Sequence, residues 1–214
     1  MLESLISRQV DGFCVGAPWN SVAVDQGAGC ILHFSSEILA HAAEKVLALR
    51  AHWAEENPDV LARLVRANQR AAAFIEDVSN RAETTAMLAT PNRIGVAAEV
   101  INRTLDGRLK VAPDGSVRTD DRYLLVGRDG AARPDPVQAA WLYAQMVRWG
   151  QAPLSNELFA AAKGVFRPDL FTAALQSDDA NSAAPADGIR AFAGPPFNAE
   201  DISGHLKFWA MKQR

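Results

Sequence analysis

Short apolar runs alternate with helical patterns near the start of the chain, an order typical of an α/β protein. The runs that predict strands are Phe13–Val15, Cys30–Phe34 and Val46–Leu49. The first run ends at Gly16 and leads through Pro18 into a helix that closes at Gly27, because Pro favours the first position of a helix and Gly its C-terminal cap. The pattern therefore predicts a strand that turns directly into a helix, a junction at which α/β proteins hold ligands.

Helical spacing dominates the rest of the chain. Asn57 and Pro58 predict a helix start, and apolar positions then recur at helical spacing as far as Ile75. Asp114 and Gly115 predict the turn of a hairpin. Further helices are expected over residues 2–8, 37–43, 81–89, 95–105, 136–149, 154–165, 169–176 and 199–212. The expected fold class is a helix-rich α/β protein.

Composition and charge limit the classes of partner. The 214 residues are 49% hydrophobic and 22% charged, with a formal net charge of −3, which suits one domain or two small ones. Basic residues are interspersed with acidic ones, so we expect no nucleic acid or anionic membrane as partner. No apolar run is long enough to span a bilayer. Residues 1–10 lack the order of a secretory signal, so the chain as written predicts a cytoplasmic protein.

The sequence shows none of the common catalytic motifs. It contains no phosphate-binding glycine loop, no G-x-S-x-G, no H-E-x-x-H and no C-x-x-C. Cys14 and Cys30 lie in apolar runs, which predicts buried free thiols, and the four histidines form no metal spacing. The tryptophans expected in the core are Trp53, Trp141 and Trp149. We therefore expect neither an enzyme nor a bound cofactor or metal.

The junction at Gly16 is the feature whose local chemistry suits a ligand. A helix N-terminus presents N–H groups without partners and a partial positive charge, and both favour a small anion. Because glycine has no Cβ, a ligand can approach the backbone closely at Gly16. The same residues also fit an ordinary Gly-x-Pro helix start, which is common. The local pattern leaves both interpretations open.

Four blocks of sequence follow one another with nearly constant spacing: DGFCVGAPWNSVAVDQGAG, AAEKVLALRAHWAEENPDV, AAWLYAQMVRWGQAP and VFRPDLF. Together they resemble the solute-binding proteins of nitrate and bicarbonate ABC importers. They also resemble a close offshoot, the cytosolic nitrate sensor that partners an RNA-binding antiterminator. The resemblance extends from about Val10 to about Leu175, and more weakly to the tail, where AFAGPPFNAEDISGHLKF is similar to the family's closing segment.

The resemblance implies a type II periplasmic-binding-protein-like fold, in which two lobes hold the anion in the cleft between them. In that family the FCVG block falls near the middle of the chain, so this sequence resembles a C-terminal portion whose N-terminal half is missing. Residues 1–44 are then a remnant of the second lobe with the anion-site junction, and residues 45–176 the C-terminal part of the first lobe. Residues 177–188 are a flexible linker by composition, and residues 189–214 hold a tail helix.

The resemblance implies two ligand contacts, each assigned to the residue of this chain that stands at the matching position of a family block. Gly16 matches a glycine whose backbone lines the anion pocket, and Lys45 matches a lysine that closes the block reading HAAEK here, from His41. Lys45 follows Gly16 by 29 positions (45 − 16), as the family spacing requires. A Lys ammonium suits a planar monovalent oxyanion. Bicarbonate-binding relatives differ at this lysine and use a metal, so the resemblance implies nitrate or nitrite. By itself, Lys45 also fits a solvated lysine at a helix end.

Three functions follow as alternatives. The chain is the C-terminal part of a periplasmic solute-binding protein that serves the membrane subunits of an ABC importer. Alternatively, it is part of a cytosolic nitrate sensor that releases an RNA-binding antiterminator protein when anion binds. The third alternative is a truncated reading frame without independent function. The remaining ligand contacts of the family lie in the half that the sequence does not contain, so no further residues are assigned.

Overall fold

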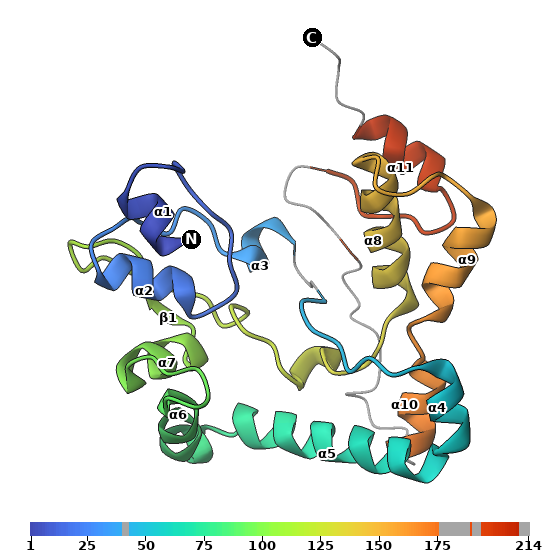
Figure 1. Ribbon diagram of the computed structural model, residues 1–214, viewed down its shortest axis with the longest axis horizontal. Coiled ribbons are helices and arrows are strands. Elements are labelled where there is room, and N and C mark those ends of the chain that lie inside the picture. Colours follow the sequence, from blue (N-terminus) through green and yellow to red (C-terminus); the bar gives the residue numbers. More distant parts are fainter. Residues whose placement is uncertain (40–42, 176–188, 190–193, 210–214) are drawn as a thin grey trace. The chain divides into compact units, whose positions relative to one another are not determined.

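The computed structural model of the chain describes residues 1–39, 43–175, 189 and 194–209 (Figure 1). The chain divides into two compact units. The first unit consists of residues 1–37 and 74–125, and the second takes in residues 38–73 and everything described from 126 onward. Helices are the main regular secondary structure of both units, and a small sheet lies in the first.

The first unit builds a hairpin against a pair of helices. Helices α6 and α7 pack against each other, and β1 also contacts α7 and α2. The strands β1 and β2 pair antiparallel, with Leu109 opposite Arg118. The elements of this unit are α1 (Leu2–Ile6), α2 (Trp19–Asp25), α3 (Ser35–Ile38, which ends at the unit boundary), η1 (Val78–Asn80), α6 (Arg81–Ala89), α7 (Ala98–Leu105), β1 (Arg108–Lys110) and β2 (Val117–Thr119).

Gly107 makes the sharp connection from α7 to β1. Its φ of +62° lies in the left-handed region, which only glycine adopts without a steric cost. A Cβ at this position would lie 2.1 Å from the carbonyl oxygen of Asp120. The Gly107 carbonyl in turn accepts a hydrogen bond from Asp120 N at 2.8 Å. The close approach of these two backbones therefore requires glycine.

A small apolar cluster holds the hairpin of the first unit to the segment before α3. Phe34, Leu109 and Val111 are buried together. Tyr123 meets the Phe34 ring edge to face, with the ring centres 5.1 Å apart, and Ile31 N donates to the Val111 carbonyl at 2.8 Å. The cluster fixes residues 31–34 against β1 although they are not part of the sheet.

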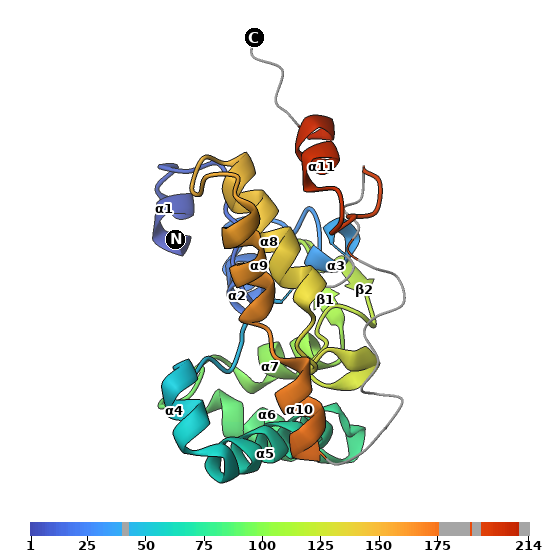
Figure 2. The ribbon, with the colours of Figure 1, turned by 90° about the vertical axis from the view of Figure 1, so that its right-hand side faces the viewer.

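The second unit is entirely helical apart from its connecting segments, as far as the chain is described. Its longest helix is α5, the teal helix of Figure 1, and α10 lies beside it (Figures 1 and 2). Arg66 Nη1 donates to the Ala174 carbonyl at 2.9 Å and ties the two helices together. The elements are α4 (Ala51–Glu56), α5 (Pro58–Glu76, whose last turn crosses into the first unit), η2 (Arg128–Gly130), α8 (Pro136–Arg148), α9 (Asn156–Gly164), α10 (Pro168–Leu175) and α11 (Ile202–Phe208).

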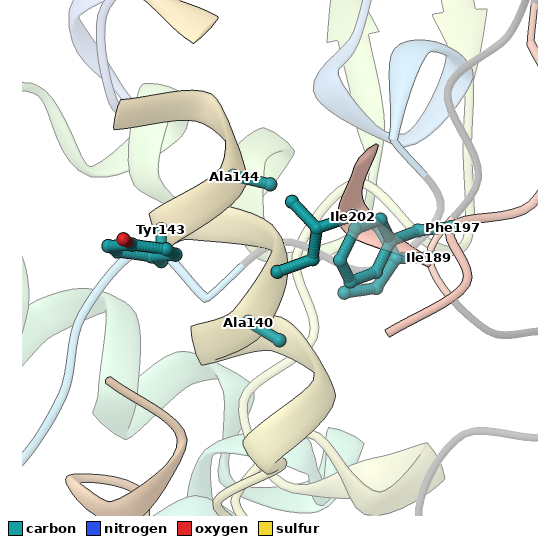
Figure 3. Close-up of a cluster of buried hydrophobic side chains, with 6 residues drawn as sticks. All are labelled: Ala140, Tyr143, Ala144, Ile189, Phe197 and Ile202. Carbon is teal, nitrogen blue, oxygen red and sulfur yellow. The ribbon is translucent and has the colours of Figure 1, made fainter. Parts of the chain in front are cut away.

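Helix α8 forms the centre of the second unit's core. Ala140 and Ala144 are fully buried on one face, and the side chains of Ile202 and Phe197 pack against that face (Figure 3). Tyr143 leaves the helix on the other side (Figure 3). Two alanines one turn apart let a neighbouring segment come close to the helix backbone, and the larger side chains of that segment fill the space.

The hydroxyl of Tyr143 joins α8 to the start of α9. It donates to the Pro153 carbonyl at 2.6 Å and accepts from Ser155 N at 2.9 Å. Ser155 is the N-cap of α9, and its Oγ accepts from Leu158 N. A single phenol therefore satisfies two backbone groups in the segment that leads from α8 into α9.

Helix α11 is attached to the end of α8 by polar and aromatic contacts. Gln145 Nε2 lies 3.1 Å from His205 Nε2, and the Phe197 ring meets the His205 ring edge to face. The Arg148 guanidinium lies 5.1 Å from the ring centre of Trp149 and 5.2 Å from that of Trp209. These contacts secure α11 in addition to the buried Ile202.

Most of the predicted helices are confirmed. The best matches are α5 and α6, which begin at Pro58 and at Arg81 as expected. Asp135 caps α8 by accepting a hydrogen bond from Val137 N at 2.9 Å. The predicted hairpin is also confirmed, with Asp114 Oδ1 accepting from Ser116 N in the turn. The helix α4 was not predicted. The predicted linker, residues 177–188, and the end of the tail helix lie outside the described residues.

The three predicted strands, Phe13–Val15, Cys30–Phe34 and Val46–Leu49, are wrong. Within the described residues these segments have no regular secondary structure, and β1 and β2 are the paired strands. An apolar run becomes a strand only where a neighbouring backbone supplies hydrogen bonds along its length. Among the described residues, Ile31 makes one such bond. Val46 and Leu47 remain 61% and 51% exposed.

The predicted burial of both thiols and of Trp149 is also wrong. Cys14 and Cys30 are exposed, because no sheet forms that would cover one face of their segments. Trp149 is 57% exposed. It follows the last residue of α8, where it contacts Arg148 rather than the core. Trp141 packs against the core cluster as expected, and Trp53 is half-buried.

Candidate functional site

The junction at Gly16 is an exposed turn that leads into α2. Gly16 is exposed, and the Ala17–Pro18 peptide bond that follows it is cis. Pro18 is buried and forms the N-cap of α2, which has no side-chain cap. Trp19 N lies 3.4 Å from the Gly16 carbonyl, a long hydrogen bond. The N-cap residue Pro18 therefore binds none of the first N–H groups of α2 with its side chain, and Gly16, which has no Cβ, lies two positions before it.

Asn20 fixes the first turn of α2 to a distant part of the first unit. Its Nδ2 donates to the Tyr123 hydroxyl at 2.9 Å, and its Oδ1 accepts from Ser21 N at 2.9 Å. Ser21 is buried, and its hydroxyl has no hydrogen-bond partner within the described part of the chain. Sequence reasoning missed these residues. Asn20 and Tyr123 are separated by 103 positions, so no local spacing could connect them.

Two acidic residues of the first unit, Asp25 and Glu37, are paired with cations. Asp25, the last residue of α2, pairs with Arg103 at 2.5 Å and with Lys110 at 3.5 Å. Glu37 accepts from Phe34 N and pairs with Arg118. The hydrogen bond from Phe34 N, followed by the charge of Arg118, lowers the pKa of Glu37 below its usual value.

Lys45 is exposed, in the segment that leads to α4. It makes no ion pair or hydrogen bond with its side chain among the residues that the structure describes. His41, at the start of its block, lies outside those residues. Gly16 belongs to the first unit and Lys45 to the second. The two predicted contacts therefore lie in different units, and their assignment to one anion site stays a prediction.

Among the described residues, no group of three or more His, Cys, Asp and Glu side chains is arranged to hold a metal ion. In the same part of the chain, no helix has the length and apolar character needed to cross a membrane.

Comparison with known proteins identifies relatives along almost the whole chain. Residues 1–89 match the NMT1-like family. The nitrate/nitrite binding protein NrtA of Synechococcus elongatus is 29% identical over 99% of this chain and 49% of its own length. The nitrate import ATP-binding protein NrtC of a Synechocystis species is 29% identical over 97% of this chain and 31% of its own length. The bicarbonate transport ATP-binding protein CmpC of the same genus is also 29% identical, over 96% of this chain and 31% of its own length.

The structure is similar to a solved one as well. It superimposes on the crystal structure of the periplasmic nitrate-binding protein NrtA from Synechocystis PCC 6803 with a TM-score of 0.88 at 25% identity, covering 97% of this chain and 55% of that one. The predicted family resemblance and the predicted fold, a helix-rich part of a periplasmic-binding-protein-like structure, are thereby confirmed. The chain spans between about a third and half of the length of the sequence relatives described above.

Proposed function

From its homology to nitrate-binding proteins, we propose that this chain forms part of a small-anion binding protein that takes nitrate or nitrite and serves an ABC importer. The relatives are named as binding or transport proteins for nitrate, nitrite or bicarbonate, which supports a binding role rather than an enzymatic one. The observation that carries the proposal is the likeness to NrtA over 97% of this chain.

The chemistry of the two candidate contacts supports an oxyanion. The uncapped start of α2 offers backbone N–H groups and a partial positive charge beside Gly16. Lys45 offers a mobile ammonium whose donors no residue of the described chain occupies.

A binding titration of two proteins tests the proposal. The first is the 214-residue chain alone, and the second is the same chain fused behind the N-terminal part of Synechocystis NrtA. Nitrate, nitrite and bicarbonate are each titrated by calorimetry. We expect the fusion to bind nitrate or nitrite and the chain alone to bind little, because a cleft needs both walls. Failure of the fusion to bind any of the three would contradict the proposal.

Two substitutions in the fusion test the assigned residues. Lys45→Ala is expected to weaken nitrate binding by about 10- to 100-fold, since a charge-assisted hydrogen bond contributes about 1.5–3 kcal/mol. Gly16→Val is expected to weaken nitrate binding further, because the branched side chain of the valine occupies the space of the ligand. Lys207→Ala removes another exposed lysine and is the matched control, with unchanged binding. Undiminished binding by Lys45→Ala would show that Lys45 is not a ligand contact.

The cytosolic sensor is the alternative function. It predicts that nitrate changes the affinity of the fusion for an RNA-binding antiterminator protein, whereas the importer predicts a complex with ABC membrane subunits. A truncated chain without independent function binds neither partner nor anion by itself.

A further inference from the structure

A cavity of about 290 Å³ opens beside α5, and arginine side chains dominate its lining. The lining residues are Arg63, Arg66, Gln69, Arg70 and Leu175. The three arginines stand three and four positions apart on α5, a spacing that places side chains on one face of a helix. Four of the five lining residues thus come from two turns of one helix, and α10 supplies the fifth from its last position.

The three guanidinium groups are not used alike. Arg66 donates to the Ala174 carbonyl and holds α10 in place. Arg63 and Arg70 are exposed, and within the described part of the chain no carboxylate pairs with either. Like charges at this spacing on a helix repel each other. The cavity therefore carries positive charge that no described acidic group neutralises.

Gln69 adds a polar group that also lacks a partner. Its side-chain oxygen is buried, and no donor among the described residues reaches it. A side-chain amide can turn over so that its NH₂ group takes the place of its oxygen. The lining of the cavity would then include amide donors in addition to the guanidinium groups.

We propose that this cavity binds a small oxyanion with more than one negative charge, a phosphate or diphosphate group. Guanidinium groups bind phosphate oxygens in pairs through their planar fork of donors. A cavity of about 290 Å³ is at the small end of ligand pockets, which suits a diphosphate rather than a large ligand. A net charge of −3 for the whole chain argues against the extended basic surface that nucleic acid requires.

The cavity is separate from the proposed nitrate contacts. None of its lining residues is Gly16 or Lys45. A monovalent anion such as nitrate would leave most of the positive charge of three arginines uncompensated, so the two sites differ in the charge of the anion they favour. Phosphate-type anions are therefore expected to bind whether or not the nitrate proposal is correct.

Calorimetric titration of the full 214-residue chain with inorganic diphosphate tests the proposal, at constant ionic strength. Orthophosphate and nitrate are titrated in parallel, and a ribonucleoside diphosphate distinguishes a free anion from one carried on a larger molecule. Diphosphate is expected to bind with 1:1 stoichiometry and more tightly than orthophosphate, and nitrate is expected not to compete with it. Absence of diphosphate binding, or equal binding of nitrate in competition with it, would overturn the proposal.

Three variants test whether diphosphate binds in this cavity. Arg63→Gln and Arg70→Gln are each expected to weaken diphosphate binding by about tenfold or more, the effect of losing a charge-assisted hydrogen bond. Arg70→Lys keeps the charge but loses the planar fork, so an intermediate loss is expected. Without anion, the variants are expected to melt at the same temperature as the parent or slightly higher, because repulsion on α5 is relieved.

The control is Arg93→Gln, an equal change of charge at an exposed arginine of the first unit. It is expected to leave diphosphate binding unchanged. A loss of binding in Arg93→Gln that matches the loss in Arg70→Gln would show a response to net charge only, and the cavity would then not be a site.

Discussion

Gly107 is the residue at which the backbone leaves the least room for a side chain. We expect Gly107→Ala to destabilise the protein by about 2 kcal/mol or more, because a left-handed φ costs a non-glycine residue about 1–2 kcal/mol and the Cβ would also meet the Asp120 carbonyl. Gly27→Ala is the matched control, with a φ of +69° and open space around the added Cβ. Urea unfolding measures both variants. An equal loss of unfolding free energy in the two variants would show that the contact of the added Cβ with the Asp120 carbonyl costs nothing.

His205 makes the stability of the second unit depend on pH. Burial, followed by the charge of Arg148, lowers the pKa of His205 in the folded protein below its ordinary value of 6.5. The unfolded chain therefore binds the proton more readily than the folded chain. The stability that neutral His205 contributes is present above about pH 6.5 and decreases as the pH falls below that value.

We expect the free energy of unfolding to fall more steeply between pH 7.5 and about 5.5 in the parent than in His205→Gln. We compare the slope of unfolding free energy against pH rather than the free energy itself, because the packing lost with the His205 ring lowers stability at every pH alike. His52→Gln is the control, because His52 is exposed and pairs only with Glu56. Urea unfolding at several pH values measures the slopes. Parallel curves for the parent and His205→Gln would contradict the prediction.

At the scale of elements, most helices and the hairpin could be predicted, but the three apolar runs predicted as strands are wrong. The start and end of α8 are set by Asp135 and by the glycine just beyond its last turn, Gly150, both local in sequence. A strand depends on a second backbone, which is often far away in sequence. Val46–Leu49 has an apolar pattern but is exposed, while the strands that do form, β1 and β2, are joined by a turn that the sequence shows.

The candidate site was predictable to a smaller extent than the helices. The helix start after Gly16 follows from local residues, and α2 confirms it. The ligand role of Gly16 and Lys45 comes from the family resemblance and stays a prediction. The hydrogen bond from Asn20 to Tyr123 and the arginine-lined cavity both depend on tertiary packing, so neither could be read from a motif.

The connection between α8 and α9 depends on one hydroxyl group. We expect Tyr143→Phe to destabilise the protein by about 1–3 kcal/mol, because Ser155 N and the Pro153 carbonyl lose their partner in a half-buried position. Thermal unfolding monitored by circular dichroism measures the change. Since the ring itself is retained, its contact with Phe159 is expected to persist. A loss below about 0.5 kcal/mol would mean that water replaces the hydroxyl.

At the scale of the whole molecule, exposed apolar segments predict self-association. Val46 and Leu47 are more than half exposed in an extended segment whose backbone is not in a sheet. Such segments pair readily with other chains. We expect the isolated chain to elute as oligomers or aggregates in size-exclusion chromatography, and Leu47→Lys to shift it toward the monomer. Val78→Lys, at another exposed apolar residue, 72% exposed, is the control. A monomeric parent with a sharp thermal transition would contradict this prediction.

The contacts of Arg148 give the protein a built-in optical reporter. Two of its five tryptophans, Trp149 and Trp209, share this one guanidinium group, and Trp209 directly follows α11 while Trp149 directly follows α8. Separation of α11 from α8 would move the Trp209 indole away from the cation and further into water, while Trp149, which follows Arg148 directly in the chain, would keep its contact. Intrinsic fluorescence can therefore follow the attachment of the last helix in solution without any added label.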